Sequence, residues 1–182
     1  IEPWQPMLMR VKAISERSGM LQPLGKSQEA SAMDAAARKQ IVSIIDDVDD
    51  MTIATVRDDS YPQATTVSYV NDGMAIYFGT SSDSQKAQNI ASNKKVSLTI
   101  NRTYSNWDEI EGLSISGTAA AVTDPAEKEK VGTLLLKKFP QVKDFMPPDM
   151  PPEALVIFRI EPKFVSLLDY KKGFGHTESF EI

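Results

Sequence analysis

The chain has 182 residues and a formal net charge of −5, and it contains no cysteine. This length is typical of one domain, and 41% hydrophobic with 25% charged residues favours a folded globular protein. The net charge argues against a general nucleic-acid binder, and the missing cysteine excludes disulfides, thiolate zinc sites and cysteine nucleophiles. No apolar run reaches the roughly 18 residues that cross a bilayer, and no secretory signal is evident, so we expect no membrane partner and a cytoplasmic location.

Three segments of the chain differ in composition. Residues 1–32 mix prolines and glycines with short apolar pieces, so we interpret them as an irregular N-terminal arm. Residues 33–170 carry the sustained periodic patterns of a folded domain. Residues 171–182 are polar and glycine-rich, which predicts a C-terminal tail outside the core.

Within the domain, helical stripes are interspersed with β-branched, alternating runs. A helical stripe is predicted from Asp34 onward, and further helices are predicted to start at Ser82 or Asp83 and at Asp124. The side chains of Ser82, Asp83 and Asp124 can accept hydrogen bonds from a free helix N-terminus. Residues 146–152 form a proline-rich connector. Strands are predicted at residues 51–57, 64–70, 74–80, 96–100, 110–122, 155–160 and 163–170.

The strands follow one another mostly in hairpins, and Asn71-Asp72-Gly73 is a strong turn signal between two of them. They do not alternate one-for-one with helices, which argues against a doubly wound parallel sheet. Short antiparallel strands of this number usually close to remove their edges. The predicted fold class is therefore mainly β with flanking helices, a small barrel of six to seven mostly antiparallel strands. Gly112 and Gly117 are expected at bends or bulges, and Pro162 is expected to separate the last two strands.

The segment 80–86 gathers hydroxyls and one lysine where the second predicted helix begins. Lys86 would fall in the first helical turn, where the positive end of the helix dipole disfavours a cation. A bound anion would resolve this conflict, with the hydroxyls of Thr80, Ser81, Ser82 and Ser84, the free N–H groups and Lys86 forming a phosphate cradle. In the structural alternative, Ser82 and Asp83 cap the helix and Lys86 pairs with a nearby acid. The residues alone leave both interpretations open.

Motifs for other chemistry are missing from the sequence. It has neither the phosphate-binding loop of nucleotide hydrolases nor the glycine fingerprint of dinucleotide-binding folds. His176 is the only histidine, so one chain cannot build a two-histidine metal site. The aspartates at 46–50 are more typical of a solvated helix end than of a metal site. We therefore expect no metal and assign no catalytic residue.

The order of these segments resembles the FMN-binding split-barrel family related to pyridoxamine 5′-phosphate oxidase. The similar stretches are MTIATV (51–56), TTVSYV (65–70), NDG (71–73), IYFGT (76–80), SQKAQNIASNKKVSLTI (84–100) and LSISGTAAAV (113–122). The resemblance implies a split β-barrel that binds FMN. It implies that the FMN phosphate is held by Thr80, Ser84 and Lys86. It also implies that the flavin ring is lined by Thr65, Thr66, Val67 and Ser68.

The resemblance further implies a homodimer with flavin sites at its interface. The implied activity is that of an oxidoreductase of undetermined substrate, in which the flavin transfers hydride or electrons. Thr65 stands where pyridoxal-phosphate-forming oxidases have an arginine, and no arginine follows Arg159, so we do not expect pyridoxal phosphate as the product. The alternative is a non-enzymatic or haem-binding member, with His176 as the available axial ligand. Four aromatic residues are expected either to wall the pocket or to pack in the core or on the surface: Tyr69, Tyr77, Tyr104 and Trp107.

Overall fold

The computed structural model describes residues 31–145 and 151–182, together with residues 147 and 149. The predicted N-terminal arm lies outside the described residues except for Ser31 and Ala32, which form a short strand. The proline-rich connector lies outside them at residues 146, 148 and 150. The division into an N-terminal arm and a following domain stays a prediction.

The helices and strands alternate irregularly along the chain, as the sequence patterns predict. The helices are α2 (Ala35–Asp47), α3 (Gln85–Ser92), α4 (Pro125–Lys138) and α5 (Val142–Phe145), and the 3-10 turns are η1 (Trp107–Glu109), η2 (Pro152–Ala154) and η3 (Tyr170–Lys172). The strands are β1 (Ser31–Ala32), β2 (Asp50–Val56), β3 (Pro62–Ser68), β4 (Val70–Asp72), β5 (Ala75–Ser81), β6 (Lys95–Asn101), β7 (Glu111–Ala121), β8 (Leu155–Asp169) and β9 (Thr177–Glu181).

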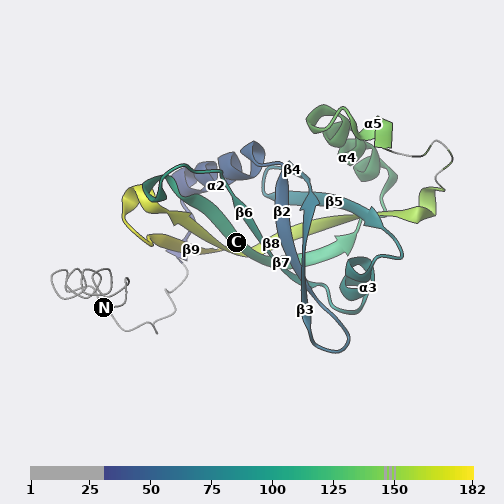
Figure 1. Ribbon diagram of the computed structural model, residues 1–182, viewed down its shortest axis with the longest axis horizontal. Helices are drawn as coiled ribbons and strands as arrows, with labels where there is room; N and C mark the ends of the chain where they lie inside the picture. Colours follow the sequence, from purple (N-terminus) through teal and green to yellow (C-terminus); the bar gives the residue numbers. More distant parts are fainter. Residues whose placement is uncertain (1–30, 146, 148, 150) are drawn as a thin grey trace, which may run out of the picture.

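All nine strands of the described residues belong to one curled sheet (Figure 1). The order is β1-β9-β8-β7-β6-β2-β3, and every pairing is antiparallel except that of β1 with β9. The long strand β8 pairs with β5 through residues 155–160 and with β9 through residues 164–168. Strand β5 also pairs with β4, so β1, β3 and β4 are the edge strands of the sheet. The predicted fold class is confirmed: the molecule is a split β-barrel with flanking helices.

The core lies between the inner face of the sheet and α2. Strands β2 and β6 alternate buried and exposed residues, as period-two strands with one solvated face do. Their buried side chains pack against three isoleucines of α2 that have no exposed surface: Ile41, Ile44 and Ile45. Each such side chain contributes roughly 1.5–3 kcal/mol by leaving water. The predicted apolar stripe of this helix is therefore confirmed as its core face.

Strand β8 corrects the prediction that Pro162 separates two strands. The strand continues through Pro162, because this residue lies beside a β-bulge and between the parts of β8 that pair with β5 and β9. Proline is tolerated at such a place since it interrupts little of the hydrogen-bond ladder. Opposite it stands Gly117, where a Cβ atom would lie 2.4 Å from the carbonyl oxygen of Glu161. The bulge predicted at Gly117 is therefore confirmed.

The C-terminal residues also differ from their prediction as a tail outside the core. Residues 177–181 form β9, which extends the sheet along the second half of β8. Phe180 is 4% exposed and belongs to the main core. A short strand near the edge of a sheet needs few apolar residues, since its backbone hydrogen bonds and one inward side chain can hold it. The polar composition of this segment is typical of an exposed tail, so the sequence alone did not predict a strand here.

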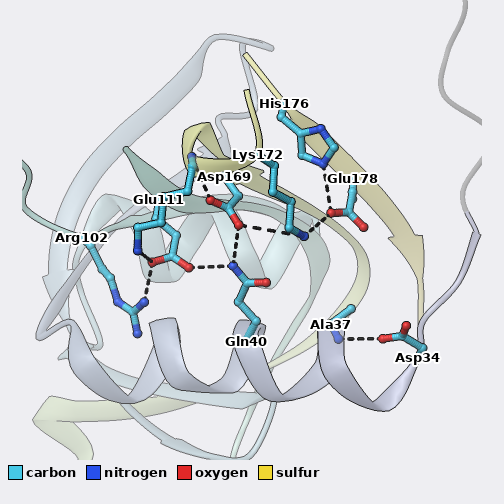
Figure 2. A network of polar contacts seen from close by, with 10 residues as sticks. Asp34, Ala37, Gln40, Arg102, Glu111, Asp169, Lys172, His176 and Glu178 are labelled. Carbon is cyan, nitrogen blue, oxygen red and sulfur yellow. Dashed lines mark hydrogen bonds and ion pairs between the residues drawn. The ribbon is translucent and has the colours of Figure 1, made fainter. Parts of the chain in front are cut away.

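A buried polar network anchors α2 to the sheet (Figure 2). Glu111 of β7 and Asp169 of β8 are direct cross-strand partners, only 5% and 4% exposed. Gln40 of α2 lies between the two carboxylates, and its Nε2 donates to both, at 2.7 and 3.0 Å. Arg102 donates to the other oxygen of Glu111 at 2.5 Å. Burial would raise the pKa of Glu111, but the hydrogen bonds from Gln40 and Arg102 outweigh it and hold that pKa below its ordinary value.

Candidate functional site

The junction of β5 and α3 determines where the hydroxyls and the lysine of the sequence motif lie. The N-cap of α3 is Ser84, whose Oγ accepts from the backbone N–H of Ala87 at 3.3 Å. The prediction that Ser82 or Asp83 caps this helix is therefore wrong. The cause is the turn after β5, in which the N–H of Ser84 donates to the carbonyl of Ser81 and delays the first helical residue. Lys86 accordingly stands in the first turn of α3, as predicted.

Two of the four predicted hydroxyls, those of Thr80 and Ser84, converge with the lysine at this helix start, whereas Ser81 Oγ donates to Asp83. Thr80 Oγ1 and Ser84 Oγ are 3.1 Å apart, and Lys86 Nζ donates to Thr80 Oγ1 at 3.4 Å. Within the part of the chain that the structure describes, Lys86 forms no ion pair with an acid. The ion pair that the structural alternative requires is thus missing there. A half-buried ammonium with one neutral partner is a suitable ligand for an anion.

A cavity of about 360 Å³ adjoins this cluster and lies between β3, β5, α3, α4 and the start of β8. Volumes of this order are typical of small-molecule sites, which are mostly apolar with a few polar groups. The polar lining comes from Ser68, Tyr77, Thr80 and Lys86. The rest of the lining is apolar or glycine: Val67, Val70, Phe78, Gly79, Val131, Gly132, Leu135, Val142, Leu155 and Ile157.

The structure brings four of the seven predicted site residues to this cavity: Val67, Ser68, Thr80 and Lys86. Ser84 lies next to it through its contact with Thr80. Thr65 and Thr66 do not line it, because only the end of β3 reaches the cavity. The roles of all seven toward a flavin stay predictions.

One wall of the cavity comes from residues that sequence reasoning missed. Val131, Gly132 and Leu135 of α4 and Val142 of α5 face the end of β3 and the middle of β5. The apolar positions of α4 predict a helix, yet nothing in the sequence tells which strands a helix so far along the chain will cover. A Cβ atom added at Gly132 would meet no atom within 4 Å. This glycine therefore leaves room inside the cavity.

The four aromatic candidates have different environments. Tyr69 is fully buried in the core, where its hydroxyl donates to the carbonyl of Ile45 at 2.8 Å. Tyr77 is the one that lines the cavity, and its hydroxyl donates to Glu127 Oε1 at 3.0 Å. Burial and this hydrogen bond raise the pKa of Tyr77, so the phenol stays protonated at neutral pH. Tyr104 and Trp107 are exposed on the surface.

His176 belongs to a different part of the molecule. It lies in the turn before β9, and its Nε2 is 3.0 Å from Glu178 Oε1 (Figure 2). Figure 1 shows the turn that leads into β9 and the helix α3 at opposite ends of the sheet. His176 therefore does not line the cavity beside Lys86. The described residues contain no group of three or more histidine, aspartate or glutamate side chains arranged for a metal ion.

The helices of the described part are all too short or too polar to cross a bilayer. A search of curated proteins finds no match to this chain. Solved structures with the same fold are found at low sequence identity.

A haem-binding protein from Mycobacterium smegmatis is 18% identical, with a TM-score of 0.66 over 84% of this chain and 60% of that one. The haem storage protein HutZ from Vibrio cholerae is 17% identical, with a TM-score of 0.57 over 68% of this chain and 88% of that one. General stress protein 26 from Bacillus anthracis is 20% identical, with a TM-score of 0.59 over 80% of this chain and 98% of that one. These likenesses show a shared fold.

A family model gives the assignment that these distant structures do not. The model described as pyridoxamine 5′-phosphate oxidase matches residues 37–167, which include the strands β2 to β7, the helix α3 and nearly all of β8. The match spans most of the chain and includes the residues around the cavity. The chain therefore belongs to the pyridoxamine 5′-phosphate oxidase family.

Proposed function

We propose that the cavity between β3, β5, α3 and α4 binds FMN. The observation that carries this proposal is the convergence of Lys86 with Thr80 and Ser84 at one end of a cavity that is otherwise mostly apolar. A phosphate matches the charged end, because an ammonium, two hydroxyls and the N–H groups of a helix start all donate hydrogen bonds. An apolar ring system matches the rest of the lining. FMN joins both parts in one molecule.

Each residue of the site would have a distinct task. Lys86 supplies the positive charge for the phosphate, while Thr80 and Ser84 orient it through their hydroxyls. Val67 and Ser68 line the ring at the end of β3. The apolar wall from α4 and α5 excludes water from the ring. FMN, when bound, supplies the redox chemistry, and the protein supplies position and electrostatics.

We propose that the reaction is an oxidation or reduction of a small molecule other than pyridoxamine phosphate. The chain has no arginine after Arg159, and the residues that follow β8 form the turn before β9 and β9 itself. This segment offers Lys171 and Lys172, but both lie in ion pairs with acids of their own surroundings. A second phosphate of a substrate would thus find no free arginine there.

We propose that two copies associate through the outer face of the sheet. In the middle of that face the exposed side chains of β6 and β7 are small: Ser97, Thr99, Ser114 and Ser116. A hollow of about 530 Å³ opens on it, and Phe164 at its border is 52% exposed. A surface of small residues with an exposed aromatic side chain suits a second protein surface. Light scattering of the wild type and of Phe164→Glu tests this, with a loss of dimer expected in the variant.

Haem is the second candidate ligand, because two proteins with the same fold are named for haem binding or storage. The absorption spectrum of the freshly purified protein separates the two. FMN gives a yellow protein with two bands near the visible, and haem gives one intense Soret band. Release by heat and identification of the chromophore completes the test. A colourless protein that also takes up neither added FMN nor added haem would refute both.

A further inference from the structure

A buried side chain joins α3 to two strands of the sheet. Asn89 is 2% exposed, and its amide makes three hydrogen bonds. Its Nδ2 donates to Thr55 Oγ1 of β2 at 2.9 Å and to Gln63 Oε1 of β3 at 3.1 Å. Its Oδ1 accepts from Gln85 Nε2 at 2.9 Å. Thr55 is itself only 1% exposed, so this contact is shielded from water.

These bonds decide how α3 is oriented on the sheet. The helix has eight residues and is too short to be stable alone. Its apolar contacts come from Ala87 and Ile90, and apolar contacts are non-directional. The hydrogen bonds of Asn89 are directional, so they restrict the rotation and sliding of the helix. Lys86 stands three residues earlier on the same helix, and its position therefore depends on Asn89.

The partner strand matters as much as the helix. Gln63 lies on β3, the strand whose end carries Val67 and Ser68. Gln63 and Val67 share one face of this strand, because they are four residues apart in a period-two structure. Asn89 thus connects the element that holds Lys86 with the element that lines the other part of the cavity.

We propose that Asn89 is a positioning residue that sets the spacing between the two ends of the ligand site. One end is the anion cradle of Thr80, Ser84 and Lys86, and the other is the end of β3. The inference rests on the proposed FMN site and adds a residue that does not touch the cavity. A ligand that spans both ends depends on their spacing, whereas a ligand that uses one end does not.

FMN and riboflavin form the matched pair of probes, because riboflavin lacks only the phosphate. Dissociation constants of both are measured by flavin fluorescence for the wild type, Asn89→Ala and Thr55→Val. Ser92→Ala, an exposed change at the end of α3, is the control. We expect the Kd of FMN to rise about tenfold or more in Asn89→Ala, and that of riboflavin to change less than about twofold. Thr55→Val removes one acceptor at nearly constant shape, so it tests the same bond if Asn89→Ala does not fold.

A positioning role and a merely structural one predict different ratios of the Kd of FMN to the Kd of riboflavin. Circular dichroism shows which variants are folded. If those variants lose affinity for both flavins by the same factor, so that the wild-type ratio is kept, the positioning role is wrong and the FMN site stands. A wild-type protein that binds neither flavin overturns the proposed FMN site, and the positioning role with it. In a Lys86→Ala background, Asn89→Ala should leave the ratio of the two constants unchanged, because the anchored end is already lost.

Discussion

Replacement of Lys86 by alanine tests the anion cradle directly. A hydrogen bond to a charged group contributes about 1.5–3 kcal/mol, which corresponds to a rise of about 10- to 150-fold in the Kd of FMN. Lys86 is only half-buried, so some of its charge is screened by water and we expect the lower part of this range. Riboflavin, without a phosphate, should bind the variant as it binds the wild type.

The same variant should hardly change the stability of the free protein. In the structure Lys86 makes one hydrogen bond of 3.4 Å to the neutral Thr80, and such a change typically costs less than about 0.5 kcal/mol. Urea denaturation measures this, and fluorescence titration measures both flavins. Lys39→Ala, an exposed lysine on α2, is the control. Unchanged FMN affinity in Lys86→Ala would refute the cradle and leave Ser84 as a helix cap only.

Three further predictions address the wall of the cavity, the C-terminal strand and the buried acids. Gly132→Phe should abolish flavin binding, because the ring fills the cavity, and it should leave the thermal midpoint of unfolding unchanged. Gly132→Ala should still bind flavin and gain up to about 1 kcal/mol of stability in urea denaturation. Tight flavin binding by Gly132→Phe would exclude this cavity as the flavin site. Phe180→Ala should lower the free energy of unfolding in urea by about 3–5 kcal/mol, because its side chain is buried in the core. Glu181→Ala, an exposed change in the same strand, should lower it little. Equal effects of the two variants would contradict the core role of β9. Because the folded pKa of Glu111 is lowered, its stabilisation is complete above the unfolded pKa and is lost as the pH falls through the folded pKa. The unfolding free energy of Glu111→Gln should therefore depend less on pH than that of the wild type below about pH 4.5, and identical slopes would show that this carboxyl does not titrate as described.

Much of the fold could be predicted because its signals are local. The stripe of α2, the cap at Asp124, and the Asn71-Asp72-Gly73 hairpin all depend on residues within a few positions of one another. The approximate N-terminal end of α3 could be predicted for the same reason. The cap itself was placed one or two residues too early, since the turn after β5 consumes residues that a cap rule alone assigns to the helix.

The features that were missed depend on distant partners. Pro162 ends a strand by its own propensity, yet β8 continues because two different strands pair with its two halves. Phe180 is one aromatic residue in a polar segment, and it reaches the core only because β9 pairs with β8. Gln40, between Glu111 and Asp169, has no sequence signal, because those acids become neighbours only through the β7–β8 register.

The sequence by itself determined the class of the fold, the family resemblance and the hydroxyls and lysine of the helix start, since these follow from local periodicity and short spacing. Only the tertiary structure decided that this helix start opens on an apolar cavity, that α4 provides its far wall, and that Asn89 ties α3 to β2 and β3. The physical reason is that a binding site needs surfaces from several elements. Their relative placement comes from the packing of the whole core, and no single stretch of sequence contains it.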